Sequence, residues 1–193
     1  MKKPSIINNF KTTNWSGGTT TELFIYPPNS SYQERNFAFR LSTATVNINK
    51  SEFTSLPNVC RKIMVLDGAI ELNHEQQYIK KLNPFQTDSF KGDWKTSCKG
   101  TCTDFNLMTT GNTSGNIEAI TLNENDTHTY QPTKNANWLF IYAYTGQVSL
   151  NLKDNIYTLG EGHLFVLNEA KFQTIEIKSN VKSELIFTTV KTN

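Results

Sequence analysis

The chain has 193 residues, enough for one domain or two small ones, and its 19 basic residues nearly balance its 17 acidic ones. A net charge of +2 argues against nucleic acid or an anionic membrane as the partner. Lys2 and Lys3 precede only two isoleucines before Asn8, so a signal-peptide core is not expected, and no run of residues approaches membrane-spanning length. Three cysteines without paired spacing indicate reduced thiols, and we therefore expect a cytoplasmic protein.

The first informative stretch, residues 14–22, combines an aromatic residue, two glycines and three threonines ahead of an apolar strand that ends at Pro27 and Pro28. Glycine pairs occur where the backbone needs positive φ or must approach another group closely. The threonine hydroxyls, the Trp15 indole and the Glu22 carboxylate supply hydrogen-bonding groups at the strand entrance. The stretch therefore predicts either a plain turn before a strand or one wall of a binding site.

Strand patterns dominate the next part of the chain. Residues 37–46 alternate at period two, which places Arg40 and Ser42 on one face among small side chains. Small neighbours leave room above a sheet, as the wall of a pocket requires. In the following strand, residues 61–66, Arg61 shares its face with isoleucine and valine.

A further strand covers residues 103–108 and places Asp104, Asn106 and Met108 on a single face. The segment after it, residues 109–116, is rich in Thr, Gly, Asn and Ser and is therefore predicted to be a linker. Beyond this segment the pattern predicts strands at residues 138–144, 148–152, 156–159, 164–167, 175–177 and 184–190. No long helix is expected.

The two halves of the sequence repeat with a shift of 78 residues (146 − 68), which superposes the hairpin turn at Gly68 on the turn at Gly146. Strand, glycine turn, strand and a Gly or Pro corner form the rhythm of a double-stranded β-helix. We therefore predict an all-β cupin fold with two cupin-like halves in one chain, a bicupin. The predicted halves are residues 1–110 and 111–193, with equivalent hairpins at the two glycines.

Neither a metal centre nor a nucleophilic triad is expected from the sequence. His74, His128 and His163 are scattered and form no HxH pair, so we predict a protein without a metal or another cofactor. Ser16 precedes a glycine pair, but the strand–turn–helix context of a nucleophile elbow is missing.

Charged side chains on inward faces are costly unless they are paired or used. Two interpretations stay open: an internal ion pair between Arg40 and Asp104, and a ligand site. Ser42 and Asn106 add more polarity than one ion pair requires, which favours a ligand site. We expect the head groups of Arg40 and Asp104 to lie within about 8 Å of each other, facing one pocket.

Together these residues resemble the HutD/Ves family. The resemblance rests on motifs in the correct order: Trp15-Ser-Gly-Gly-Thr-Thr-Thr-Glu22, Tyr26-Pro27, Arg40-Leu-Ser42-Thr-Ala44-Thr-Val46, Phe53-Thr-Ser-Leu-Pro57, Arg61, Leu66-Asp-Gly68, Phe90-Lys-Gly92-Asp93 and Asp104-Phe-Asn106-Leu-Met108. These motifs cover about residues 14–108, and the second half matches mainly in rhythm. Asn58 stands where the family commonly has glycine, and asparagine tolerates the left-handed region better than most residues. The resemblance implies a bicupin fold and a small-molecule-binding role, suggested to be that of a sensor or regulator in histidine utilisation, without an assigned activity.

The sequence thus predicts a metal-independent bicupin that binds a small polar, anionic metabolite. Arg40 and Arg61 would bind a carboxylate, because a guanidinium can donate to it bidentately. Glu22, Asp104 and Asn106 would orient the arginines or accept the ligand's N–H groups, and Trp15 would cover the mouth. The predicted ligand-binding residues are Trp15, Gly17, Gly18, Glu22, Arg40, Ser42, Arg61, Asp104, Asn106 and Met108.

Two alternatives from other classes remain. The first is a metal-free enzyme, an isomerase or lyase with Glu22 or Asp104 as general base. The second is an interaction protein with internal salt bridges and no ligand. Nucleic acid and membrane are not expected as partners, and a homodimer is left open.

Overall fold

The computed structural model describes residues 3–133, 135–153, 155–169 and 174–192, and within these ranges every regular element is a β-strand. The all-β class predicted from the period-two patterns is confirmed. No helix of the described ranges is long and apolar enough to cross a membrane.

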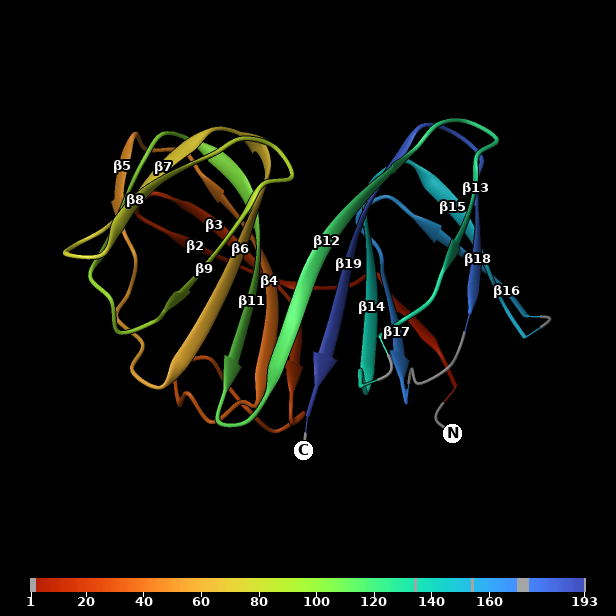
Figure 1. Cartoon of the computed structure of the whole chain (residues 1–193), viewed down its shortest axis with the longest axis horizontal. Coiled ribbons are helices and arrows are strands. Elements are labelled where there is room, and N and C mark those ends of the chain that lie inside the picture. Colours follow the sequence, from red (N-terminus) through yellow and green to blue (C-terminus); the bar gives the residue numbers. More distant parts are fainter. Residues whose placement is uncertain (1–2, 134, 154, 170–173, 193) are drawn as a thin grey trace. The chain divides into compact units, whose positions relative to one another are not determined.

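The chain forms two compact units, which Figure 1 shows. The N-terminal unit is Phe10–Ser114, and the C-terminal unit contains the chain from Gly115 onward together with the first strand, β1 (Ser5–Ile7). The sequence placed the boundary after residue 110 and the first residues in the N-terminal half. In the structure β1 instead pairs antiparallel with β17 (Leu164–Asn168). The sequence of a three-residue strand does not indicate which distant strand it pairs with.

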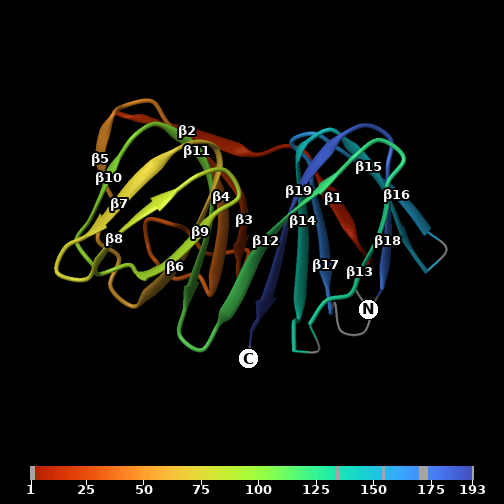
Figure 2. The same ribbon diagram turned by 45° about the horizontal axis from the view of Figure 1, so that its top comes forward.

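The N-terminal unit has two sheets. The larger contains, in order of pairing, β2 (Lys11–Trp15), β3 (Gly18–Tyr26), β4 (Phe39–Val46), β11 (Cys102–Thr110), β6 (Val59–Gly68) and β9 (Thr87–Lys91). The smaller contains β5 (Lys50–Glu52), β10 (Thr96–Lys99), β7 (Ile70–His74) and β8 (Tyr78–Leu82). One apolar cluster takes side chains from both sheets, so the sheets face each other across a shared interior (Figure 2).

The C-terminal unit also has two sheets. The larger contains β1, β17, β14 (Trp138–Thr145), β19 (Ser183–Lys191) and β12 (Ser114–Leu122). The smaller contains β13 (Thr127–Tyr130), β18 (Ile175–Ser179), β15 (Gln147–Leu152) and β16 (Asn155–Gly160). The order β4–β11–β6–β9 of the N-terminal unit recurs here as β12–β19–β14–β17, and β5–β10–β7–β8 recurs as β13–β18–β15–β16.

The two glycines that the sequence superposed occupy equivalent hairpins. Gly68 ends β6 just before β7, and Gly146 lies between β14 and β15. Gly68 has φ 80° and Gly146 has φ 79°. A Cβ atom would lie 2.4 Å from the Thr101 carbonyl oxygen at the first glycine and 2.5 Å from that of Lys182 at the second. Only glycine fits both the backbone conformation and the close approach of the neighbouring chain.

Two local predictions need correction. The segment predicted as a linker is mostly strand: β11 continues to Thr110 and β12 begins at Ser114, because Thr and Ser suit strands as well as loops. Residues 11–26 form a hairpin of β2 and β3 and not a loop before one strand, with the chain reversing at Ser16 and Gly17. Asn58 has φ 65°, which is the left-handed region expected for it.

Candidate functional site

The interior face of the larger N-terminal sheet carries a row of polar and charged side chains. The strand register sets their positions: Met108 lies opposite Arg40 on one side and Arg61 on the other, while Asn106 lies opposite Ser42. Glu22 of β3 lies opposite Ser42 of the neighbouring strand β4. Seven predicted site residues therefore meet on this face: Glu22, Arg40, Ser42, Arg61, Asp104, Asn106 and Met108.

Arg40 contacts three neighbouring side chains. Its Nε donates to Glu22 Oε2 at 2.7 Å and its Nη1 donates to Ser42 Oγ at 3.1 Å. The Tyr32 ring lies over the guanidinium, with 4.7 Å between Cζ and the ring centroid. Of the interpretations left open by the sequence, the internal ion pair between Arg40 and Asp104 does not form in the described part of the chain. Arg40 pairs instead with Glu22, one of the three residues expected to orient the arginines.

Arg61 is buried between aromatic rings. Its Cζ lies 4.5 Å from the centroid of Phe53 and 5.4 Å from that of Phe90. Burial lowers the pKa of Arg61 to about 10, although electrostatic interactions with Tyr32 and Asp104 oppose this shift, so the side chain remains a cation at neutral pH. Its Nε atom is buried without a hydrogen-bond partner among the described residues.

Asp104 and Asn106 form the other side of this group. Burial raises the pKa of Asp104 to about 7, although the nearby Arg61 charge and the hydrogen bonds from Asn106 and Cys102 oppose this shift. Asn106 Nδ2 donates to Asp104 Oδ1, which fixes the orientation of the amide. The amide oxygen, Asn106 Oδ1, is buried and has no partner among the described residues.

The interior of the N-terminal unit thus presents one unmatched donor, on Arg61, and one unmatched acceptor, on Asn106. Arg61 lies opposite Met108, two residues along β11 from Asn106, so the two side chains are diagonal neighbours with backbones roughly 7–8 Å apart. Leaving such groups unmatched costs about 1–3 kcal/mol each. A small molecule that bound both atoms would have to offer an acceptor to Arg61 and a donor to Asn106.

Trp15, Gly17 and Gly18 lie beyond the Asp104 end of this group. Gly18 lies opposite Val46, which is six residues along β4 from Arg40, or about 20 Å, and two residues from Ala44, the register partner of Asp104. A Cβ atom on Gly18 would lie 1.8 Å from the Thr45 carbonyl oxygen, and one on Gly17 would meet the Trp15 ring at 2.2 Å. The glycines therefore permit close chain packing at this end of the sheet.

The aromatic side chains over the two arginines were not identified from the sequence. Tyr32 lies in the connection between β3 and β4, and Phe53 follows β5. Phe90 reaches Arg61 from β9, directly opposite in the register. Phe53 and Phe90 stand in the motifs quoted above, but a ring–guanidinium contact depends on pairing between distant segments and has no local pattern.

The donor set of this interior does not fit a metal ion. Among the described residues, no group of three or more His, Cys, Asp or Glu side chains is placed to hold one. The groups that lie nearest Asp104 include the Arg61 guanidinium, whose charge repels a cation.

Comparisons with known proteins agree on the architecture. A family model described as HutD matches residues 7–187. A conserved protein of unknown function from Pseudomonas aeruginosa PAO1 superposes with a TM-score of 0.84 at 18% identity, covering 99% of this chain and 100% of that one. HutD from Pseudomonas fluorescens SBW25 gives 0.70 at 20% identity, with 98% and 100% covered. A cupin 2 conserved barrel domain protein from Leptotrichia buccalis gives 0.58 at 8% identity, with 97% and 96% covered. None of the curated proteins matches. At these identities the solved structures show the fold alone, which is cupin-like.

Proposed function

The chain belongs to the HutD family, and from that premise we propose that its N-terminal unit binds a small polar, anionic metabolite without a metal. The protein acts in the cytoplasm as a sensor or regulator linked to histidine utilisation, the role that the family resemblance implies. Its two units are the halves of a bicupin, and the recurring strand order of the two pairs of sheets supports this assignment.

The observation that carries the proposal is the buried, unmatched pair formed by Arg61 Nε and Asn106 Oδ1. Arg40 is neutralised by Glu22, so it adds little net charge to the interior. Arg61, by contrast, forms no ion pair within 4.0 Å in the described residues. One cation is therefore available for a ligand, which favours a singly charged carboxylate.

The surroundings of Arg61 suit carboxylate recognition. Phe53 and Phe90 cover the guanidinium, so that a ligand approaches its N–H edge. Arg61 is only 7% exposed, and burial strengthens a charge-assisted hydrogen bond that forms there. Asn106 Oδ1 accepts an N–H or O–H donor of the same ligand, because its orientation is set by Asp104.

The test is a thermal-shift screen of histidine-pathway intermediates and simple carboxylic acids, followed by calorimetric titration of the best ligand. Arg61→Leu should abolish binding yet change the free energy of unfolding by no more than about 2 kcal/mol, because an apolar residue replaces a buried charge. Lys81→Met, which removes one exposed positive charge on β8, is the matched control and should bind normally. Unchanged affinity in Arg61→Leu would overturn the proposal.

Arg40→Met distinguishes an internal ion-pair role. This substitution leaves Glu22, whose side chain is 30% exposed, able to regain water. If no acid binds the wild-type protein and both arginine variants lose several kcal/mol of stability, the arginines serve the fold and the protein is an interaction protein without a ligand.

A second candidate function, a metal-free isomerase or lyase, is favoured by one observation. Asp104 is buried beside Arg61 with a pKa of about 7, which suits a general base at neutral pH. Glu22 is committed to Arg40 and is the weaker candidate base. Exchange of a carbon-bound proton of the bound ligand in D₂O, lost in Asp104→Asn while binding persists, would support the enzyme.

A further inference from the structure

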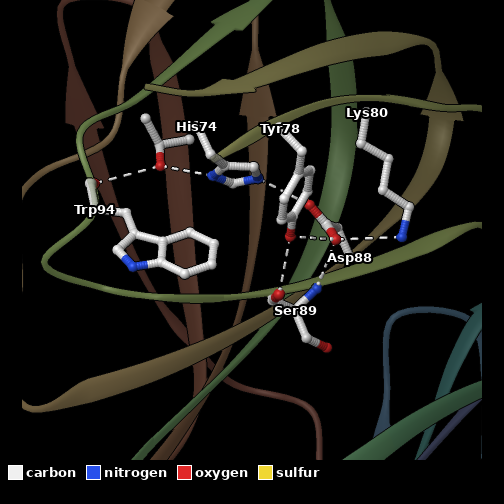
Figure 3. A network of polar contacts seen from close by, with 7 residues as sticks. His74, Tyr78, Lys80, Asp88, Ser89 and Trp94 are labelled. Carbon is white, nitrogen blue, oxygen red and sulfur yellow. Dashed lines mark hydrogen bonds and ion pairs between the residues drawn. The ribbon is translucent and has the colours of Figure 1, made fainter. Parts of the chain in front are cut away.

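A second polar cluster of the N-terminal unit, which Figure 3 shows, shares no residue with the proposed ligand site. Its centre is the pair of His74 on β7 and Asp88 on β9, whose Nε2 and Oδ2 atoms are 2.9 Å apart. The other ring nitrogen, His74 Nδ1, lies 2.8 Å from Thr96 Oγ1. His74 is 1% exposed and Asp88 is 4% exposed, so the pair is closed to solvent.

Asp88 is saturated by donors. Besides His74, it accepts the Tyr78 hydroxyl at 3.1 Å, Lys80 Nζ at 3.2 Å and the Ser89 backbone N–H at 2.9 Å. Burial opposes its ionisation, but these hydrogen bonds outweigh burial and the pKa of Asp88 lies below its ordinary value. The carboxylate is therefore a fixed anchor that holds the His74 ring in one orientation.

The His74 ring in turn contacts the ring that covers Arg61. The centroids of His74 and Phe90 are 4.6 Å apart, and the Arg61 Cζ lies 5.4 Å from the Phe90 centroid. Phe53 meets Phe90 edge-on at 5.7 Å and covers the same guanidinium. One aromatic ring thus separates the buried histidine from the unmatched donor of the ligand site.

The C-terminal unit shows that the fold does not require this cluster. The shift of 78 residues places Leu152 at the position of His74. Asp88 lies opposite Ile63, and the corresponding partner of Ile141 is Phe165, so an apolar ring replaces the carboxylate. Leu152 and Phe165 belong to the apolar core of that unit. In the unit with an apolar core, a leucine and a phenylalanine thus occupy the positions of the histidine and the aspartate.

We propose that His74, held by Asp88 and Thr96, is a positioning residue for the anion site: it fixes the Phe90 ring, which sets the orientation of the Arg61 guanidinium. The inference rests on the proposed function, since it assigns a role in the binding of the anion. We therefore predict that a substitution of His74 changes the orientation of the Arg61 guanidinium through the Phe90 ring that lies between them.

The experiment measures the Nε–H resonance of Arg61 by NMR in the ligand-free protein and then titrates N-acetylglycine, a probe that carries one carboxylate and one N–H. His74→Leu, the residue used by the C-terminal unit, should shift the Arg61 resonance and weaken binding of the probe by about fivefold or more. His74→Gln, which keeps a donor for Asp88 but removes the ring, should show the same loss. This second variant retains the buried hydrogen bond if the leucine variant fails to fold.

Lys80→Met is the matched control, because it removes another Asp88 partner whose side chain is 45% exposed. It should leave both the resonance and the affinity unchanged. If the His74 variants lower only the melting temperature and leave the Arg61 resonance in place, the cluster is merely structural and the inference is wrong. If the resonance shifts but the wild-type protein binds no carboxylate, the positioning stands and the proposed function fails.

Discussion

The two units of the chain share a strand order but differ in what their interiors contain. By strand register, the positions of Arg61, Asp104 and Asn106 correspond to three core residues of the C-terminal unit. These are Leu139, Leu185 and Phe187, each 0% exposed. The same sheet arrangement is therefore compatible with an apolar interior and with one that contains two charged groups.

This difference indicates that the buried charges of the N-terminal unit are not needed to stabilise the fold. Buried ionic groups contribute little net stability when an apolar core of similar volume is available. The C-terminal unit displays such a core at the corresponding positions. The polar interior of the N-terminal unit is thus better explained by use than by stability, which supports the proposed ligand site.

The largest effect is expected when a polar side chain is introduced into the interior of the C-terminal unit, which tests the difference between the two interiors. Phe187→Asn introduces the amide found at the equivalent N-terminal position and should cost roughly 5 kcal/mol of the free energy of unfolding, because it opens a cavity and buries an unmatched amide. Urea denaturation measures this loss. Gln147→Asn, on an exposed position of the same unit, is the control. A loss below about 2 kcal/mol would mean that this interior tolerates polarity too.

Asp104→Asn tests the N-terminal interior through pH. Burial raises the Asp104 pKa from 3.8 to about 7, so the folded state binds the proton more tightly than the unfolded state. The contribution of this group to stability is therefore greatest below pH 4, falls as pH rises to about 7, and is then constant. Asp104→Asn should lack this decline, a difference of a few kcal/mol in urea denaturation across that range. Parallel pH curves for the two proteins would contradict the prediction.

The glycine turns test the likeness between the units. Gly68→Ala and Gly146→Ala should each cost about 2 kcal/mol or more, since both combine positive φ with a backbone oxygen in the way. Gly111→Ala is the matched control, because Gly111 has φ 58° but no atom within 4 Å of an added Cβ. Denaturation midpoints of the three variants would separate the cost of the steric clash with the neighbouring chain from the cost of the positive φ angle. Equal losses at all three sites would show that the close approach is unimportant.

The smallest expected effect concerns Lys80, which belongs to the cluster found in the N-terminal unit alone. Its ion pair with Asp88 is partly exposed, so Lys80→Met should cost less than about 1 kcal/mol. Thermal denaturation at two salt concentrations measures this contribution. A loss of several kcal/mol would instead make Lys80 part of the buried anchor, and it would no longer serve as a control for the His74 variants.

The faces of the strands could be predicted because side-chain alternation is local. Arg40, Arg61, Asp104 and Asn106 lie on the inward faces that the period-two patterns assigned to them. Glu22 and Asp104 were both candidates to orient Arg40, and the sequence did not decide which of them pairs with it. A β-bulge between Glu22 and Phe24 shifts the register of β3, and a bulge in one strand is not visible in the sequence of its neighbour.

Long-range positions account for the remaining differences. Trp15 was expected at the mouth of the pocket, and its position depends on the hairpin of β2 and β3, which places it opposite Gly18 and level with Val46 of β4. Tyr32 and Phe53 cover the arginines from connections whose course the strand pattern does not determine. The role of His74 likewise depends on three strands meeting in space.

The pairing of β1 with β17 has a consequence for the order in which the protein is made. β1 leaves the ribosome before the N-terminal unit, yet its partner strand emerges only after the whole N-terminal unit has been synthesised. At about 5–20 residues per second, the N-terminal unit has seconds in which to fold before that partner exists. The N-terminal unit, which has the charged interior, is therefore synthesised before the rest of the C-terminal unit, and β1 has no partner strand during that time.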